Sequence, residues 1–252
     1  MPALFVGHGS PMNAVEENGF SRAWAEAAGS LPRPESILCV SAHWETAGTR
    51  VTAMERPRTI HDFLGFPKSL FEVEYPASGS PGLARLVRET VRATPVREDS
   101  GWGLDHGAWS VLRRMFPAAD VPVVQLSLDR TKGPAFHYAV GRELRLLREK
   151  GVLIVGSGNI VHNLGLMVWR DTAHDWAAKF DERMKEFILS GDHGAVIAYP
   201  ELGEAARLSV PTNEHFLPLL YVLALQDEGD RIGFFAEQVT LGSISMRSLR
   251  IG

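Results

Sequence analysis

Three histidines of this chain each follow an apolar run, and they are the residues best suited to bind a metal ion. The histidines are His8, His43 and His162, and the runs cover residues 3–6, 37–40 and 152–155. Short runs rich in β-branched and aromatic residues are typical of buried strands. Ligands of open α/β sheets bind outside the carboxyl ends of the strands. We therefore expect these imidazoles to converge, as a Zn or Fe(II) site requires.

His215 is a fourth candidate ligand. We expect it in the first turn of a helix that continues to Leu225, with Thr212 or Asn213 as the N-cap. The spacing of the four histidines matches no local zinc motif such as H-E-x-x-H. Each of them, taken alone, also fits an ordinary hydrogen-bonded histidine. The metal prediction therefore depends on their convergence.

The other five histidines differ in their surroundings. His106 lies between Asp105 and Gly107, which suggests an accessible acid or base that Asp105 orients. His61 lies in a segment where substrate contact is plausible. We expect the remaining three at the surface or at helix ends, namely His137, His174 and His193.

Residues 59–80 combine many aromatic and turn residues and show no clear periodicity. A long irregular loop in a compact domain is usually functional or disordered, and the aromatic content argues against disorder. We expect this segment to act as a lid or a pocket wall. Phe63, Phe66 and Tyr75 are its candidate contacts to an aromatic ligand.

The rest of the chain alternates between helical and strand patterns. Helices are predicted over residues 20–29, 81–93, 108–115, 136–150 and 176–190, strands over 51–54 and 121–128, and a strand–turn–strand over 234–251. This alternation predicts one α/β domain over residues 1–252, with a central mostly parallel or mixed sheet and helices on both faces. We expect the C-terminal strands to extend the sheet as antiparallel edges.

The composition excludes several classes of partner. The net charge is −4, which does not favour nucleic acid or an anionic membrane. No apolar run is long enough to span a bilayer, and the N-terminus lacks the pattern of a signal peptide. The one cysteine, Cys39, lies in an apolar run and is expected to be buried. We expect a cytoplasmic protein, and the sequence leaves open whether it forms a homo-oligomer.

Five motifs together resemble the DOPA 4,5-dioxygenase (extradiol) family, which belongs to the class III extradiol ring-cleavage dioxygenases. They appear in the family's order over nearly the whole chain. The motifs are Gly7-His8-Gly9-Ser10-Pro11, Ser41-Ala42-His43-Trp44-Glu45, Asp105-His106-Gly107, Gly156-Ser157-Gly158-Asn159 with Val161-His162-Asn163, and Glu214-His215-Phe216-Leu217-Pro218.

The resemblance implies a non-haem Fe(II) site that is often found occupied by zinc, with His8 and His43 as two ligands. The third ligand is expected to be His215, although Glu214 beside it is the alternative carboxylate. His162 is implied both as a ligand and as an acid/base residue.

The resemblance also implies the reaction. An aromatic diol binds the metal through adjacent oxygens and reacts with dioxygen to give a ring-opened semialdehyde. His106 and His162 are the expected catalytic acid/base residues. Ser10, His61 and Tyr75 are the expected substrate contacts.

Two other functions stay open at this point. A zinc ion held by three neutral histidines would activate water, as in a metal-dependent hydrolase. A non-catalytic metal-binding relative is the third possibility, although the presence of His8, His43 and His215 speaks against it.

Overall fold

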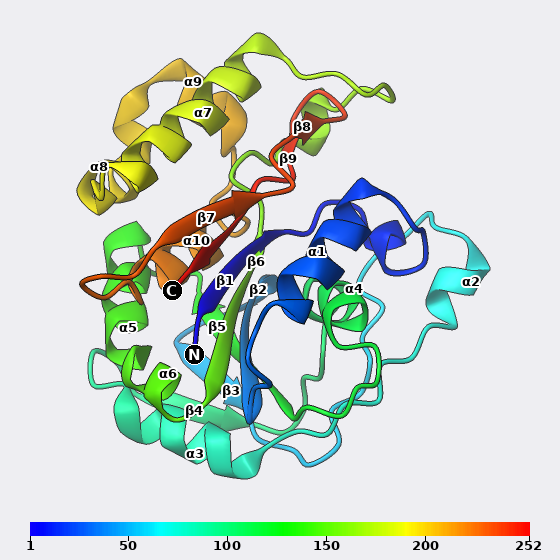
Figure 1. The fold of residues 1–252 in the computed structure, drawn as a ribbon, viewed down its shortest axis with the longest axis vertical. Coiled ribbons are helices and arrows are strands. Elements are labelled where there is room, and N and C mark those ends of the chain that lie inside the picture. The colour runs from blue at the N-terminus through cyan, green and yellow to red at the C-terminus, as the bar shows by residue number, and fades with distance from the viewer.

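An eight-stranded sheet runs through the middle of the protein, in the order β4-β3-β5-β2-β6-β1-β10-β7 (Figure 1). The computed structural model describes all 252 residues. The strands of this sheet are β1 Ala3–Gly7, β2 Ser36–Thr46, β3 Thr49–Thr52, β4 Val96–Asp99, β5 Val123–Asp129, β6 Val152–Gly158, β7 Ile232–Phe235 and β10 Ser248–Ile251. A separate two-stranded ribbon pairs β8 Val239–Thr240 with β9 Ile244–Ser245.

The four central strands are parallel, and antiparallel pairs occur toward the edges. β5, β2, β6 and β1 run in one direction, so their carboxyl ends meet at one edge. β10 pairs with β1 antiparallel, and β7 pairs with β10 antiparallel. The predicted mixed sheet and the antiparallel C-terminal strands are confirmed. Strand β4 was not predicted, because its residues Val96–Asp99 are mostly charged.

Helices cover both faces of the sheet (Figure 1). One face packs against α1 Gly19–Gly29 and α4 His106–Met115. The other packs against α3 Pro81–Thr90, α5 Pro134–Leu144, α6 Leu146–Glu149 and α10 Leu217–Leu223. The remaining helices are α2 Lys68–Phe71, α7 Asp175–Leu189, α8 His193–Ile197 and α9 Glu204–Ser209, with short 3₁₀ turns at Pro11–Ala14, Leu164–Leu166 and Tyr199–Leu202.

Most predicted elements are present, but several boundaries differ. The helix predicted over residues 136–150 is divided at Arg145 into α5 and α6. Helix α10 begins at Leu217, after His215, and its cap residue Phe216 makes no side-chain cap hydrogen bond. The predicted caps Thr212 and Asn213 are therefore wrong. The backbone carbonyl of Asn213 instead accepts from the N–H groups of Phe216 and Leu217.

Two expectations about single residues have opposite outcomes. Cys39 is fully buried and unpaired, as predicted. His137 is not at the surface: its side chain is fully buried, and its Nδ1 lies 3.1 Å from the Tyr221 hydroxyl. The amphipathic pattern of α5 did not reveal this, because α10 covers the face that carries His137.

None of the helices combines the length and the apolar character that a membrane span requires.

We expect His137 to make the protein less stable in mild acid. Burial lowers its pKa to about 4. In the unfolded chain His137 is protonated below about pH 6.5, whereas in the folded chain it stays neutral down to about pH 4, so the free energy of unfolding falls over this range. Between pH 7 and pH 5 the free energy of unfolding is expected to fall by about 2 kcal/mol. Urea unfolding of the wild type and His137→Gln at both pH values measures it. An equal loss in both proteins would contradict the prediction.

Candidate metal centre

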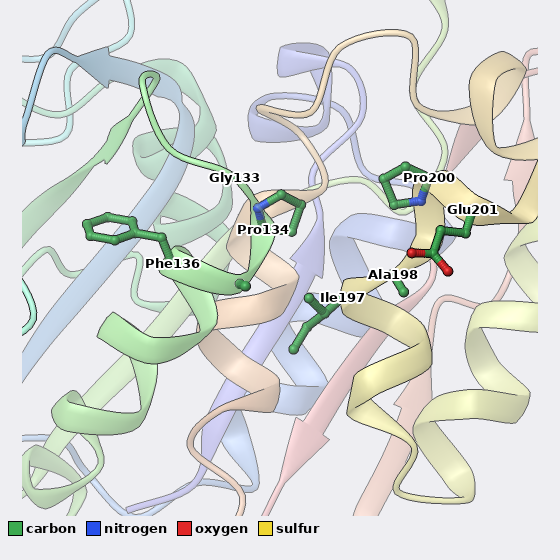
Figure 2. Close-up of a pocket in the computed structure, with 8 residues that line it drawn as sticks. Gly133, Pro134, Phe136, Ile197, Ala198, Pro200 and Glu201 are labelled. Atoms are coloured by element: carbon green, nitrogen blue, oxygen red, sulfur yellow. The ribbon is translucent and has the colours of Figure 1, made fainter.

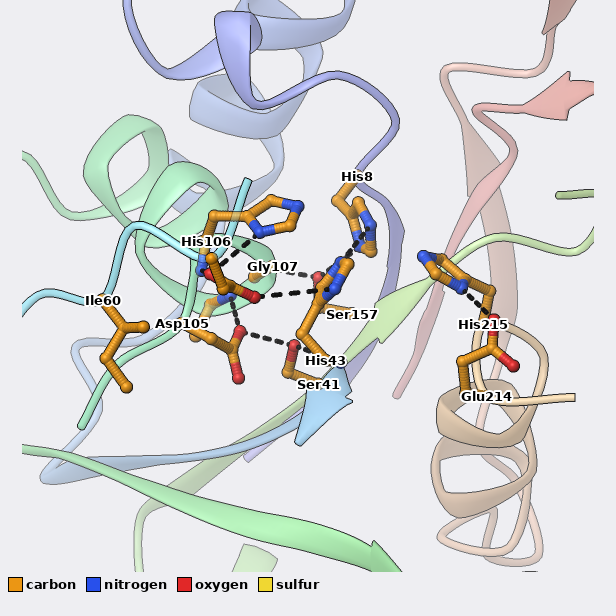
Figure 3. Close-up of polar contacts among 12 residues, drawn as sticks. His8, Ser41, His43, Ile60, Asp105, His106, Gly107, Ser157, Glu214 and His215 are labelled. Atoms are coloured by element: carbon orange, nitrogen blue, oxygen red, sulfur yellow. Dashed lines mark hydrogen bonds and ion pairs between the residues drawn. The ribbon is translucent and has the colours of Figure 1, made fainter. Parts of the chain in front are cut away.

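Histidines from four separate segments meet above the carboxyl ends of the parallel strands. Figure 3 shows the rings of His8, His43 and His106 together, with His215 approaching them from the other side. His8 directly follows β1, and its backbone N–H donates to the Gly158 carbonyl at the end of β6. The predicted convergence of His8, His43 and His215 is present: one ring nitrogen from each lies within 4.8 Å of the others.

The hydrogen bonds of His8 leave its Nε2 free to bind a metal. The Ser157 hydroxyl donates its single proton to the Gly107 carbonyl at 2.6 Å. Its oxygen therefore accepts from His8 Nδ1, at 3.0 Å. His8 must then carry its proton on Nδ1 and present the lone pair of Nε2 to the cluster. This buried chain also fixes the orientation of the ring.

The sequence suggested that His43 follows the end of a strand, but His43 lies inside β2. The pairing of β2 with β5 changes register between Val40 and Glu45, so His43 lies in an irregular part of the strand. Such irregularities often direct side chains into active sites. Gly107 makes room for it, because a Cβ there would lie 2.8 Å from a carbon of the His43 ring.

The spacing of His8 and His43 matches what a shared metal ion needs. Their Nε2 atoms are 3.2 Å apart. Two nitrogens each about 2.1 Å from one ion lie about 3.0–3.4 Å from each other in tetrahedral or octahedral geometry. The donor set and its spacing therefore fit a metal ion, and no movement of the two rings is needed.

His215 is oriented by its neighbour in the chain. Its Nδ1 lies 2.9 Å from Glu214 Oε1, which also accepts a hydrogen bond from the Thr212 hydroxyl. Glu214 therefore holds the proton on Nδ1 and leaves Nε2 of His215 free. The close contact between the end of β6 and the segment before α10 supports this placement, since a Cβ on Gly158 would collide with the His215 carbonyl oxygen.

Burial keeps these imidazoles neutral. It lowers the pKa values of His8 and His215 well below 6.5, and the neighbouring histidines lower them further. Burial and the nearby His106 lower the pKa of His43 to about 3. Neutral imidazole is the form that binds metal. The site therefore offers three unprotonated nitrogens at pH 7.

His162 lies beside this group rather than in it. Its ring stacks on His215, with centroids 3.5 Å apart and planes 7° from parallel. A ring nitrogen of His162 lies within 4.8 Å of ligand atoms of Glu214 and His215, and these three residues form a separate group. Burial lowers the pKa of His162 to about 4, so the ring is neutral at pH 7. His162 lies outside the group that His8, His43 and His215 form.

His106 is buried at the first position of α4, and the residue that faces it is Asp62. His106 Nδ1 lies 3.0 Å from Asp62 Oδ1, although the ring is turned out of hydrogen-bond alignment. The backbone N–H of His106 donates to the same oxygen at 2.9 Å. Asp62 was not singled out in the sequence. The only signal was a carboxylate next to His61 in the aromatic loop.

The expected role of Asp105 as the residue that orients His106 is wrong. Asp105 is the N-cap of α4 and accepts from the Ala108 N–H. It also accepts from the Ser41 hydroxyl at 2.6 Å and from Gln125 Nε2 at 2.7 Å. Burial and the charge of Asp62 raise the pKa of this carboxyl. Asp105 thus ties the start of α4 to β2 and β5 beneath the histidines.

The three expected substrate contacts have other partners. The Ser10 hydroxyl accepts from the Met12 N–H at the start of a 3₁₀ turn. His61 Nε2 lies 2.9 Å from the Val73 carbonyl oxygen. Tyr75 is buried in the core, and its hydroxyl donates to the carbonyl of Phe116. Phe116 follows the C-terminal end of α4, whereas His106 is at the N-terminal end. Tyr75 therefore does not line the histidine cluster.

The aromatic loop reaches the cluster through Phe63. Its ring meets His106 edge to face, with centroids 5.5 Å apart. Phe66 packs behind Phe63, at 5.3 Å. The prediction that residues 59–80 are largely irregular is correct, apart from the short helix α2.

A hollow of about 420 Å³ lies away from the histidine cluster, between the start of α5 and the segment from α8 to the following 3₁₀ turn (Figure 2). Pro134 and Phe136 line it on one side, and Ile197 and Pro200 on the other. Glu201 is its only charged residue, and it contains no histidine. Its lining therefore provides a single carboxylate and none of the groups suited to a metal ion.

Comparison with known proteins agrees with this geometry. Residues 2–243 match the family described as the catalytic LigB subunit of aromatic ring-opening dioxygenase. The chain belongs to this family. It is a metal-dependent ring-opening dioxygenase, an oxidoreductase that uses an aromatic substrate and dioxygen. The dioxygenase predicted from the motifs is thus confirmed.

Named relatives of this chain include bacterial and plant proteins. A 4,5-DOPA dioxygenase extradiol of Escherichia coli is 48% identical, covering 100% of this chain and 95% of the relative. The protein of the same name from Beta vulgaris is 36% identical over 90% of this chain and 88% of the relative. The fold is also similar to the crystal structure of an uncharacterized Escherichia coli protein. The match covers 100% of both chains, with a TM-score of 0.88 and 43% sequence identity.

Proposed function

We propose that this LigB-family protein opens the ring of a catechol of the DOPA type in an extradiol reaction that depends on Fe(II). The observation that supports this most is the group of three neutral histidine nitrogens, within 4.8 Å of one another. The names of the bacterial and plant relatives support the DOPA-like substrate.

His8, His43 and His215 would hold the ion, with Ser157 and Glu214 fixing the rings of His8 and His215. The bound metal supplies Lewis acidity toward the two adjacent hydroxyl groups of the catechol and a site for dioxygen. With only these three protein ligands, the ion would be accessible to both. Glu214 acts by orienting His215, because the carboxylate oxygen Oε1 already accepts from His215 and Thr212.

His162 and His106 are the proposed acid/base residues. His162 is neutral at pH 7, so it can accept a proton from a catechol hydroxyl and return it later. The His106 ring lies close to the His43 ring, with centroids 3.8 Å apart and planes tilted by 44°, and it also lies against Phe63. This brings a second proton-carrying ring and an aromatic wall to the other side of the site. An aromatic ring packs favourably against such surfaces.

Reconstitution with metal tests the proposed function. The protein is stripped of metal, loaded with Fe(II) without oxygen, and then mixed with dioxygen and a panel of catechols that includes DOPA. We expect a yellow ring-opened product from the Fe(II) protein and none from the zinc-loaded protein. Binding of Fe(II) without consumption of any catechol would overturn the proposal. Hydrolytic activity with zinc alone would favour the hydrolase instead.

A further inference from the structure

One carboxylate lies between two rings of the centre and has no role so far. Asp62 Oδ1 is 3.0 Å from His106 Nδ1, and Asp62 Oδ2 is 3.7 Å from His43 Nδ1. Oδ1 also accepts from the backbone N–H of His106 at 2.9 Å. Asp62 therefore contacts both an expected metal ligand and an expected acid/base residue.

The loop that carries Asp62 is held firmly. The N–H of Ile60 donates to the Leu104 carbonyl, and the N–H of Leu104 donates to the Arg58 carbonyl. Two residues before Asp62, the Ile60 carbonyl accepts from the indole N–H of Trp109 in α4 at 2.8 Å. The loop is thus fixed to the helix that begins at His106. A carboxylate on such a support can set the position of a ring.

On the opposite side of the centre a carboxylate also faces the outer nitrogen of an expected ligand histidine, at the shorter distance of 2.9 Å against 3.7 Å for Asp62 and His43. Glu214 contacts Nδ1 of His215 and leaves Nε2 for the metal. Asp62 faces Nδ1 of His43, whose Nε2 points at His8. A carboxylate on the outer nitrogen of a ligand histidine fixes its proton and its orientation. Contacts of this kind are often loose before substrate is bound and tighten afterwards.

We propose that Asp62 is a positioning residue that holds His43 as a metal ligand and turns His106 toward the substrate. Its effect on the reaction rests on the proposed function, but its effect on metal affinity does not. Losing such a partner costs about 10–100-fold in metal affinity or activity. One residue should therefore influence two separate measurements.

The first test compares Asp62→Asn with the wild type. Asparagine keeps an oxygen for the His106 N–H but loses the negative charge and the second acceptor. We expect metal affinity and kcat each to fall about 10–100-fold, with KM and the melting temperature nearly unchanged. Asp62→Glu keeps the carboxylate and is expected to recover part of both. Asp120→Asn removes a surface carboxylate paired with Arg33 and serves as the matched control.

The second test repeats Asp62→Asn in a His106→Gln protein. If Asp62 acts on turnover through His106, its effect on kcat disappears in this background, while its effect on metal affinity persists through His43. Unchanged metal affinity and kcat in Asp62→Asn would overturn the proposal, as would a full kcat effect without His106. If the wild type opens no catechol, the metal titration alone still decides the role of Asp62 at His43.

Discussion

His8→Ala is expected to lose both the metal and ring opening. His8 contributes one of the two Nε2 atoms that lie 3.2 Å apart, and Ser157 fixes its ring for that purpose. Alanine leaves two of the three nitrogens, which do not hold an Fe(II) ion at physiological concentrations. Metal content should fall from roughly one equivalent per chain to near zero, and product formation to background. Elemental analysis and a catechol assay measure these results.

His174→Ala is the matched control for this variant. His174 Nε2 contacts the Leu166 carbonyl oxygen and belongs to none of the groups suited to a metal. Its loss should leave metal content and turnover as in the wild type. If His8→Ala instead keeps its metal and its activity, the ion must be bound by one of the two other groups, either His43 with Asp62 and His106 or Glu214 with His162 and His215. The assignment of the centre would then be wrong.

Asp105→Ala is expected to destabilise the protein by about 4 kcal/mol. The carboxylate caps α4 and accepts from Ser41 and Gln125 in the fully buried interior. Losing a cap costs about 1 kcal/mol, and each buried donor left without a partner costs about 1–3 kcal/mol. For a chain of this size the melting temperature should fall by about 10 °C. Thermal unfolding followed by circular dichroism measures the change.

Ser80→Ala separates the cap from the buried network. Ser80 caps α3 by accepting from the Leu83 N–H, without further side-chain partners. This variant should lose only about 1 kcal/mol. If Asp105→Ala loses no more than Ser80→Ala, the contacts with Ser41 and Gln125 add nothing to stability.

The sequence was sufficient to predict the fold class and most of the histidine cluster. Apolar runs mark the buried strands, and parallel strands bring their carboxyl ends to one edge, so His8 and His43 were expected at the same edge of the sheet. The motifs around them carried the family and the reaction. Local pattern also identified the aromatic loop of residues 59–80, since its lack of periodicity excludes a long helix or strand.

Only the tertiary structure decided how the rings are oriented. The position of the proton on His8 depends on two hydrogen bonds between distant segments. His8 and Ser157 are 149 positions apart in the sequence, and Ser157 and Gly107 are 50 positions apart. Asp62 and His106 are 44 positions apart, so no spacing rule connects them. Asp105, adjacent to His106, turned out to support the helix instead. Residue types and strand ends follow from local sequence, but hydrogen-bond partners depend on how distant segments pack.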